Sequence, residues 1–184
     1  MKLAKKFIFD KRGLNMDIRI AQNESDSKAA SYIYAMSWKS GYKGIFTEEL
    51  LESIPTDFWV NSFNRNYETH RFEVALMNVK GQDIGAGGYG HSRDYNDPDI
   101  GEVTSIYFLP QAWGKGYSKD LMDFIIEKLK DKGCKKIHLW VLKDNFRAKR
   151  FYEKYGFKKT GNEKSISFKG ENKIDIEYAL LEKC

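Results

Sequence analysis

Residues 110–118 (PQAWGKGYS) form the segment whose residue types most clearly indicate a chemistry. The segment follows a run rich in β-branched and aromatic residues and precedes a helical pattern of apolar residues. Its glycines leave backbone amide groups uncovered, and the N-terminus of a helix adds positive potential there. Several amides converging on one point would bind a phosphate group, although an ordinary glycine turn would explain the segment equally well. It is not a P-loop, because it lacks the spacing GxxxxGK(S/T).

A second glycine-rich segment, residues 85–90 (GAGGYG), fits the dinucleotide-binding pattern GxGxxG letter for letter. That pattern requires a helix directly after the glycines, within a parallel βαβ unit, so that the amides at the helix N-terminus meet the pyrophosphate. The polar residues 91–98 (HSRDYNDP) follow instead, and they offer no apolar helix face. We therefore interpret these glycines as places where a strand lies close to another backbone or forms a bulge.

Hydrophobic periodicity predicts the element order β-α-α-β-β-β-α-β-α-β-β, with a hairpin turn at residues 80–81. We expect Asn145 to cap one helix, and we expect Gly133 and Gly156 to end two helices. Hairpins outnumber crossovers, so the fold class is α/β (α+β) with a largely antiparallel sheet. The four predicted helices are residues 25–42, 48–54, 121–129 and 145–155, and residues 55–67 fit a further helix that this order does not count. The predicted strands are residues 18–20, 72–76, 83–90, 103–109, 136–142, 164–168 and 174–180.

The length and composition indicate one folded domain. The chain has 184 residues, of which 41% are hydrophobic and 31% are charged. This length suits one hydrophobic core and is too short for two. Residues 1–15 are expected to be an N-terminal extension, and residues 16–184 are expected to form the domain.

Several classes of location and partner are disfavoured. No stretch approaches the roughly 18 uncharged apolar residues of a membrane span, and charge breaks the N-terminal apolar run too early for a signal peptide. Cys134 and Cys184 fit neither a metal spacing nor a disulfide framework, so we expect a cytoplasmic location. The net charge of +5 and the basic residues between positions 115 and 164 fit an anionic small ligand or a solvated surface. No RNA- or DNA-binding motif is present, so neither nucleic acid nor membrane is an expected partner.

Residues 145–157 (NFRAKRFYEKYGF) match the pattern NxxAxxFYxxxGF at every fixed position. Together with residues 113–118, aligned to the pattern (Q/R)xxGx(G/A), they resemble the GNAT superfamily of N-acetyltransferases. Trp113 stands where glutamine or arginine is usual, and Ser118 stands where glycine or alanine is usual. Because backbone amides form most of such a site, we expect neither departure to abolish binding. The resemblance covers residues 17–182 in element order.

The resemblance implies a single GNAT-like domain with a mixed, mostly antiparallel central sheet of about six or seven strands. Helices would cover both faces, and two parallel strands would diverge in the middle of the sheet. The resemblance also implies acetyl-CoA as the cosubstrate and no metal. The three histidines, His70, His91 and His138, show no ligand spacing.

In the family, the pantetheine arm of the cosubstrate lies between the diverging strands. The resemblance therefore implies bonds from this arm to the backbone of Ile106 and Phe108, over the strands at residues 103–109 and 136–142. The pyrophosphate would lie on the amides of residues 114–118. The implied cofactor-binding residues are Ile106, Tyr107, Phe108, Trp113, Gly114, Lys115, Gly116, Tyr117, Ser118, Asn145 and Ala148.

Acetyl transfer to an amine needs a base for the amine, a donor for the oxyanion and an acid for the departing thiolate. Tyr152 occupies the family's general-acid position, and a phenol stays protonated at neutral pH; packing of its helix is the alternative role. Glu102 is the candidate base, with an exposed strand-end carboxylate as the alternative. His138 is a second candidate, although a lone histidine in a strand is more often structural. A backbone amide near Tyr107 or Phe108 would donate to the oxyanion.

Residues 38–46 (WKSGYKGIF) resemble the segment WxxxYxGI of small bacterial GNAT enzymes, which shapes the acceptor pocket in the family. Residues 58–59 would add further aromatic walls. The acidic residues within positions 48–52 lie nearby, and carboxylates beside aromatic rings favour a cationic amine. The alternative is that the rings belong to the core and the acids to a helix surface. The implied substrate-binding residues are Trp38, Tyr42 and Phe46.

We therefore expect an acyl-CoA-dependent N-acetyltransferase. It would transfer an acetyl group from acetyl-CoA to a primary amine of a polyamine, amino sugar or amino acid, by direct attack through a tetrahedral intermediate. Two alternatives stay open: an acyl-CoA-binding sensor or partner module without turnover, and a protein N-terminal or lysine acetyltransferase. Dimers are common in the family, so a homodimer is compatible with the resemblance. The motifs identify neither the acceptor nor the acyl chain length.

Overall fold

The computed structural model describes residues 6–9, 15–69 and 72–180. Within these ranges eight strands form one sheet, in the order β1-β2-β3-β4-β5-β6-β8-β7. The strands are β1 (Lys6–Phe9), β2 (Asn15–Ile20), β3 (Glu73–Val79), β4 (Gln82–His91), β5 (Ile100–Phe108), β6 (Lys136–Leu142), β7 (Lys158–Phe168) and β8 (Glu171–Leu180). The helices are α1 (Glu24–Gly41), α2 (Glu48–Glu52), α3 (Val60–Thr69), α4 (Tyr117–Asp131) and α5 (Phe146–Tyr155), with the 3-10 turn η1 (Pro110–Ala112) before α4.

The predicted fold class is confirmed, because every neighbouring pair of strands is antiparallel except β5 and β6. The sheet has one strand more than expected. The additional strand is β1, which lies in the predicted extension and pairs with β2 from Lys6 opposite Ile18 to Phe9 opposite Asn15. Residues 1–5 and 10–14 of that extension lie outside the described residues, as do His70 and Cys184.

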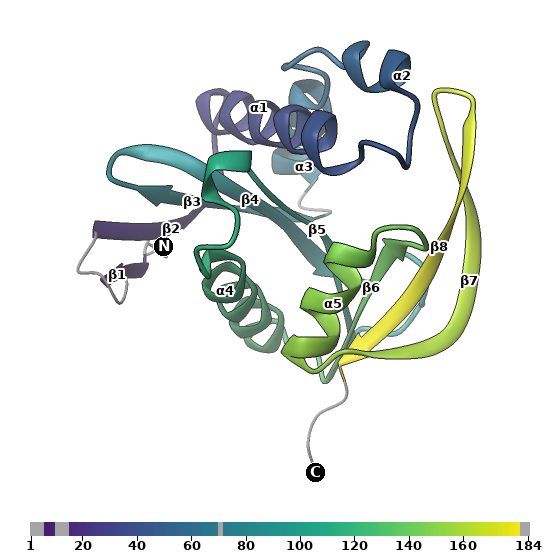
Figure 1. Ribbon diagram of the computed structural model, residues 1–184. Coiled ribbons are helices and arrows are strands. Elements are labelled where there is room, and N and C mark those ends of the chain that lie inside the picture. Colours follow the sequence, from purple (N-terminus) through teal and green to yellow (C-terminus); the bar gives the residue numbers. More distant parts are fainter. Residues whose placement is uncertain (1–5, 10–14, 70–71, 181–184) are drawn as a thin grey trace.

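Helices cover both faces of the sheet, with α1 and α3 on one face and α4 and α5 on the other (Figure 1). Successive side chains of a strand point to opposite faces, so a strand covered on both sides is apolar throughout. In β3, Val74 and Leu76 are buried in the cluster shared with α1 and α3, whereas Ala75 and Met77 are buried in the cluster shared with α4. In the described part of the chain, no helix is long and apolar enough to cross a membrane.

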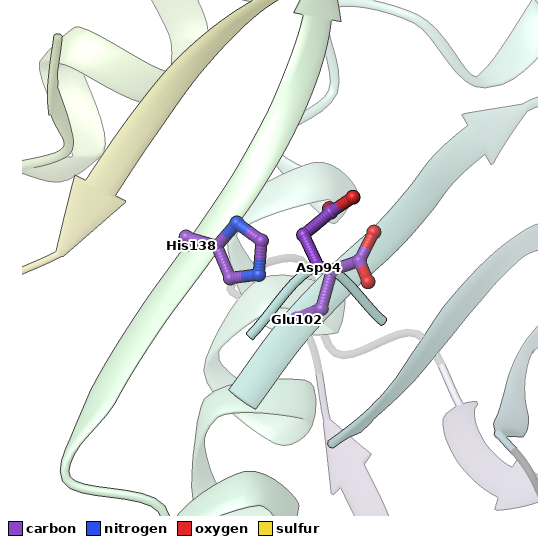
Figure 2. A group of neighbouring side chains, drawn as sticks. All are labelled: Asp94, Glu102 and His138. Atoms are coloured by element: carbon purple, nitrogen blue, oxygen red, sulfur yellow. The ribbon is translucent and has the colours of Figure 1, made fainter. Parts of the chain in front are cut away.

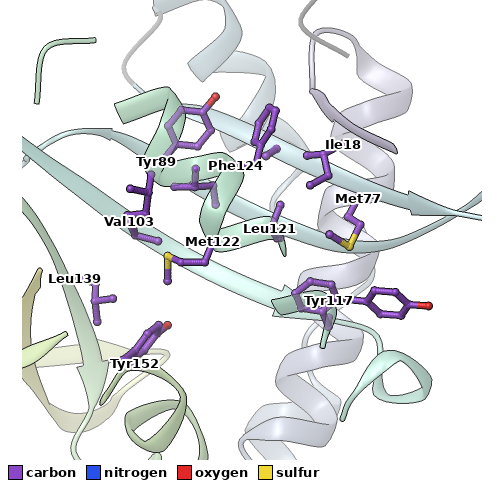
Figure 3. Packing of buried hydrophobic residues seen from close by; sticks show 14 of the residues in the cluster. Ile18, Met77, Tyr89, Val103, Tyr117, Leu121, Met122, Phe124, Leu139 and Tyr152 are labelled. Atoms are coloured by element: carbon purple, nitrogen blue, oxygen red, sulfur yellow. The ribbon is translucent and has the colours of Figure 1, made fainter. Parts of the chain in front are cut away.

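The apolar stripe predicted for α4 is confirmed. Its buried residues are Tyr117, Leu121, Met122, Phe124, Ile125, Ile126 and Leu129. These side chains meet the sheet in the larger hydrophobic cluster, where Figure 3 shows Met122 with Val103, Leu139 and Tyr152. The helix therefore fixes the position of its own N-terminus, and of the glycine segment before it, against the centre of the sheet.

The glycines of residues 85–90 serve packing, as the absence of a following helix predicts. A Cβ atom at Gly85 would collide with the Phe108 ring, and one at Gly87 would collide with Ile125 of α4. The pairing of β4 with β5 also shifts register between Gly88 and Tyr89, which is the bulge that the glycines indicated. This segment lets α4 and β5 approach β4 closely.

The divergence of β5 and β6 is the feature of the fold that creates a site. The two strands pair in parallel only from Ile100 opposite Lys136 to Val103 opposite Leu139. Beyond that point β5 continues to pair with β4 as far as Phe108, and β6 continues to pair with β8. Residues 104–108 therefore have no hydrogen-bonded strand on the side that faces β6.

Some element boundaries differ from prediction. α3 begins at Val60 rather than at residue 55, and β7 begins at Lys158 rather than at residue 164. The longer β7 forms a hairpin with β8 whose tip reaches α2 (Figure 1). There the Glu171 carboxylate accepts a hydrogen bond of 3.1 Å from the Thr47 amide, and the Lys169 ammonium donates to the Ser53 hydroxyl at 2.9 Å. The hairpin thus spans one end of the gap between β5 and β6.

Candidate active site

A pocket of about 550 Å³ occupies the space where β5 and β6 diverge. It is lined by side chains from α1, β5, β6, α5 and β8. Its lining includes most of the residues that the sequence motifs singled out, although these residues lie up to about a hundred positions apart in the chain. The predicted members of the lining are Trp38, Tyr42, Phe46, Glu102, Ile106, Tyr107, Phe108, Trp113, Gly114, Ser118, Asn145, Ala148 and Tyr152.

The glycine segment at one end of the pocket has the geometry of an anion-binding site. Gly114 and Gly116 have φ values of +74° and +86°, which residues with a Cβ rarely adopt. Gly116 is the N-cap of α4, and no side chain caps the amide groups of the first turn. These amides and the positive end of the helix dipole suit a phosphate group. We call residues 114–118 the phosphate site.

Not every predicted residue of this segment contributes a side chain to the pocket. Lys115 is exposed, and neither it nor Gly116 lines the pocket. The Tyr117 side chain is buried in the hydrophobic cluster and is 5% exposed. Its contribution to the phosphate site is therefore limited to its backbone amide, as the backbone-based motif allows.

Trp113 positions a cation that the sequence motifs did not identify. Its indole nitrogen donates a hydrogen bond of 2.9 Å to the Phe108 carbonyl. The guanidinium group of Arg147 lies 3.6 Å from the centre of the Trp113 ring, within range of a cation–π interaction. Burial lowers the pKa of Arg147, and no ion pair to it is present in the described ranges. A basic group therefore reaches the pocket from α5, near the position where the family pattern has glutamine or arginine.

Asn145 fixes the start of α5 as predicted. Its side-chain oxygen accepts a hydrogen bond of 3.1 Å from the amide of Ala148, which is the geometry of an N-cap. Because the cap sets the first turn, it also determines where Arg147 emerges. One local hydrogen bond thus positions two lining residues of the first turn, Arg147 and Ala148.

Tyr152 lies on the next turn of α5, with its ring packed against Phe157 and Tyr178. The residue is 8% exposed and lines the pocket. Burial raises the pKa of Tyr152 above its ordinary value, and the nearby Tyr107 adds to this effect. Its hydroxyl group is therefore protonated at neutral pH, and no described side chain forms a hydrogen bond with it. These are properties that a proton donor in the pocket requires.

Glu102 is buried, so the alternative of an exposed strand-end carboxylate is wrong. Its side chain is 1% exposed, and both carboxylate oxygens accept hydrogen bonds from Arg93. The guanidinium donates at 2.9 Å and 2.5 Å, and the backbone amide of Arg93 donates at 3.1 Å. The ion pair with Arg93 fixes the orientation of this carboxylate. The base role of Glu102 therefore stays a prediction, and its environment favours an electrostatic role.

Asp94, Glu102 and His138 offer ligand atoms that all lie within 4.8 Å of one another (Figure 2). These side chains already have protein partners. Asp94 pairs with Lys164 at 3.1 Å, and Glu102 pairs with Arg93. A divalent cation would compete with these two basic side chains, so we describe the group as an ion-pair network.

His138 has the structural environment that a lone strand histidine predicts. It is 3% exposed, it does not line the pocket, and its Nε2 atom lies 2.7 Å from the Ser92 hydroxyl. Its Nδ1 atom lies 3.0 Å from a carboxylate oxygen of Glu177, in an orientation that makes no hydrogen bond. Burial lowers the pKa of His138, so the ring is neutral at neutral pH. It is poorly placed to act on a substrate.

The aromatic residues at the other end of the pocket belong to both the core and the lining. The rings of Trp38 and Tyr42 lie 4.8 Å apart, and those of Trp38 and Phe46 lie 5.6 Å apart. The hydroxyl groups of Tyr42 and Tyr107 lie 3.0 Å from each other. These side chains pack in a cluster with α2 and with Phe168 of the hairpin, and they still face the cavity. We call this end the acceptor end.

The flanking residues expected at the acceptor end do not reach it. Phe58 is 40% exposed, and neither it nor Trp59 lines the pocket. Glu48, Glu49 and Glu52 are exposed on α2 and are likewise absent from the lining. Of the two interpretations of these acids, the one that places them on a helix surface is confirmed, because the short helix α2 turns Leu50 and Leu51 to the core.

The pocket contains a different carboxylate, which the sequence motifs did not identify. Asp175 of β8 lines the pocket, and burial raises its pKa to about 6. Within the described ranges its side chain makes no hydrogen bond and no ion pair. The sequence carries one relevant signal, since Asp175 and Glu177 place two carboxylates on one side of a strand whose other side is apolar.

The comparisons with known proteins agree with this geometry. The model of the acetyltransferase (GNAT) family matches residues 32–157. The spermine/spermidine N(1)-acetyltransferase of Bacillus subtilis (strain 168) is 29% identical over 108 residues, which cover 56% of this chain and 69% of that protein. An uncharacterized protein of Methanocaldococcus jannaschii is 35% identical over 65 residues, which cover 35% of this chain and 13% of that protein. The chain thus spans well under two thirds of the first curated relatives that it matches.

A solved structure supports the fold. The PaiA N-acetyltransferase of Thermoplasma acidophilum, crystallised in complex with coenzyme A, superposes with a TM-score of 0.67 at 22% identity. The superposition covers 87% of this chain and 97% of that one. The family model extends over more than half of the chain and includes β5, the phosphate site, α4, β6 and α5. The chain belongs to the acetyltransferase (GNAT) family.

Proposed function

We propose that this chain transfers an acetyl group from acetyl-CoA to a primary amine of a small molecule. The observation that carries the proposal is that one pocket joins the phosphate site, the free side of β5 and the Tyr152 hydroxyl. A long anionic thioester needs all three features. A pocket built only for binding an anion would not need a buried phenol at its centre.

The residues of the pocket suit each part of acetyl-CoA. The amides of the phosphate site and the Arg147 guanidinium suit the phosphates. Residues 104–108 of β5 have backbone groups that face the gap without a strand partner, and a pantetheine arm carries amide groups that can bond to them. The apolar side chains of Ile106 and Ala148 line the same stretch.

The chemistry then proceeds by direct attack. The neutral amine forms a bond to the thioester carbon, and the tetrahedral adduct breaks its carbon–sulfur bond. The sulfur leaves with the electron pair and takes the proton of the Tyr152 hydroxyl. The high pKa of Tyr152, which burial causes, keeps that proton in place until the thiolate forms. The nitrogen of the adduct loses one proton to solvent, and solvent returns one proton to the tyrosinate.

The enclosure of the acceptor end supports a small acceptor. The contacts of Glu171 with Thr47 and of Lys169 with Ser53 bridge the hairpin to α2 above this end. A protein N-terminus or lysine would have to enter past that bridge. The similarity to a spermine/spermidine acetyltransferase supports a polyamine as the first class to assay, with amino sugars and amino acids next.

The test is thiol release from acetyl-CoA with a panel of amines, in the wild type and in Tyr152→Phe. The phenylalanine ring keeps the packing against Phe157 and Tyr178 and removes only the hydroxyl group. We expect kcat to fall about 10²–10⁴-fold, because general acid catalysis contributes about that much, with acetyl-CoA binding unchanged.

The matched control is Tyr155→Phe on the same helix, which lies outside the pocket and donates a hydrogen bond to Asp123. We expect this variant to keep the wild-type rate. Equal rates in wild type and Tyr152→Phe would refute the acid role. Tight acetyl-CoA binding without thiol release for any amine, peptides included, would favour the sensor alternative over an enzyme.

A further inference from the structure

The charges that line the pocket are paired except at its two ends. Arg93 pairs with Glu102, and Lys164 pairs with Asp94. Among the charged lining residues that the structure describes, Arg147 and Asp175 have no ion pair. Arg147 lies by the phosphate site, where an anion is expected. By the same argument, the unpaired carboxylate at the acceptor end indicates a cation.

Asp175 lines the pocket beside the tyrosines of the acceptor end. Its strand neighbours are Leu142 of β6 on one side and Lys164 of β7 on the other. The charged and titratable groups around it are Lys164 and the hydroxyl groups of Tyr42 and Tyr107. Burial raises the pKa of Tyr42, and the neighbouring Tyr152 and Asp175 raise it further. The carboxylate therefore shares one space with the three tyrosines at the centre of the pocket.

We infer that Asp175 binds the ammonium group of the acceptor and removes its proton, so that the substrate is a cationic alkyl amine enclosed by Trp38 and Phe46. This inference rests on the proposed function. An ammonium between a carboxylate and aromatic faces is bound by charge and by cation–π attraction. An amino acid whose own carboxylate lies next to the reacting amine would be repelled by Asp175.

The protons balance with Asp175 in this role. The ammonium gives one proton to Asp175, and its freed electron pair forms the carbon–nitrogen bond. The sulfur leaves with the carbon–sulfur pair and takes the Tyr152 proton. The nitrogen of the adduct loses a second proton, which restores Tyr152 through solvent, and Asp175 releases its proton to bulk water. One proton is released for each amide formed.

Asp175→Asn tests the inference, with Glu163→Gln as the matched control. Glu163 lies on the adjacent strand, is exposed, pairs with Lys143 and does not line the pocket. With a diamine at pH 7 we expect Asp175→Asn to lower kcat/KM about 100-fold or more, as loss of a general base does, with the acetyl-CoA dissociation constant unchanged. We expect Glu163→Gln to match the wild type.

Two further readouts separate catalysis from structure. The wild-type kcat/KM should fall as the pH drops below about 6, where Asp175 gains a proton. The kcat/KM of Asp175→Asn should not show this fall. An alkoxyamine of similar size is already neutral at pH 7, so its rate should fall less than about tenfold in the variant. Equal losses for both nucleophiles, or an unchanged pH profile, would overturn the inference.

Failure of the proposed function would give a different result. In that case the wild type would bind acetyl-CoA without releasing thiol for any amine. Calorimetry of a diamine binding to the complex with coenzyme A would then decide the inference. Asp175→Asn should weaken this binding about tenfold or more, since a charged hydrogen bond contributes about that much. Equal binding to wild type and variant would overturn it.

Discussion

Replacing Asp175 by asparagine should stabilise the folded protein at neutral pH while it impairs the proposed reaction. The substitution keeps the shape of the side chain and removes its charge. It breaks no hydrogen bond of this side chain among those that the structure describes. The substitution removes the free-energy cost of holding an ionised carboxylate in a partly buried pocket. Burial imposes this cost on the folded state alone.

The magnitude follows from the two pKa values. In the unfolded chain Asp175 ionises near its ordinary value of 3.8, and in the folded chain it ionises near 6. At about 1.4 kcal/mol for each pH unit, this difference corresponds to at most about 3 kcal/mol. Because the carboxylate is partly exposed, solvent screening reduces the expected gain to about 1–2 kcal/mol.

The sign follows from which state holds the proton. Between pH 3.8 and about 6 the folded Asp175 keeps its proton and the unfolded one does not. Raising the pH through this window therefore favours the unfolded chain, and the wild type loses stability that the asparagine variant retains. The gain in stability of Asp175→Asn over the wild type should be complete above about pH 6 and absent below pH 3.8.

Urea unfolding of both proteins, followed by circular dichroism at pH 4, 6 and 8, measures this difference. Glu163→Gln serves as the control, since its exposed ion pair with Lys143 contributes little. Equal stabilities of Asp175→Asn and wild type at pH 8 would show that Asp175 is solvated, which refutes the argument. A variant less stable than the wild type would show that Asp175 accepts a hydrogen bond.

Three further substitutions test other parts of the site. Glu102→Gln should cost about 1.5–3 kcal/mol in urea unfolding, because it removes a buried acceptor of charged hydrogen bonds from Arg93. Gly116→Ala should cost about 1–2 kcal/mol at its φ of +86°, and calorimetry should show weaker acetyl-CoA binding because the amides of the phosphate site turn away. Asn145→Ala should cost about 1 kcal/mol by loss of the α5 cap and should also weaken acetyl-CoA binding.

Matched substitutions outside the pocket separate folding from binding. Gly81→Ala imposes the same backbone strain at a φ of +84°, and Asn23→Ala removes the equivalent cap of α1. Both should lower stability and leave acetyl-CoA affinity unchanged. If Gly116→Ala or Asn145→Ala affects affinity no more than its control, the residue does not contribute to the site. An unchanged stability of Glu102→Gln would show that the Arg93 ion pair contributes nothing.

Features that depend on neighbours in the chain were predictable. The α4 stripe follows from periodicity, and the Asn145 cap follows from a hydrogen bond that spans three residues. The turn at residues 80–81 and the order of the strands from β2 onward follow from local patterns as well. The motif resemblance added the divergence of β5 and β6, which periodicity alone does not indicate.

Features that depend on distant segments were not predictable. The ion pair and the burial of Glu102 depend on the loop that carries Arg93. The cation–π contact of Arg147 depends on the ring of Trp113, which lies 34 positions earlier in the chain. Nothing in the local pattern of β8 states that Asp175 faces the same space as Tyr42, more than a hundred residues away. The strand β1 was missed because a short run of four residues carries too little periodicity.

The sequence by itself thus determined the family, the order of the strands from β2 onward, the glycine segment that precedes α4 and the place of Tyr152 on α5. Each of these rests on backbone hydrogen bonds, glycine conformations or residue spacings within about fifteen positions. Only the tertiary structure decided which charges the pocket keeps unpaired. Desolvation and pairing of a charge depend on every segment that packs around it, and the fold alone brings Asp175, Tyr42 and Tyr152 into one cavity.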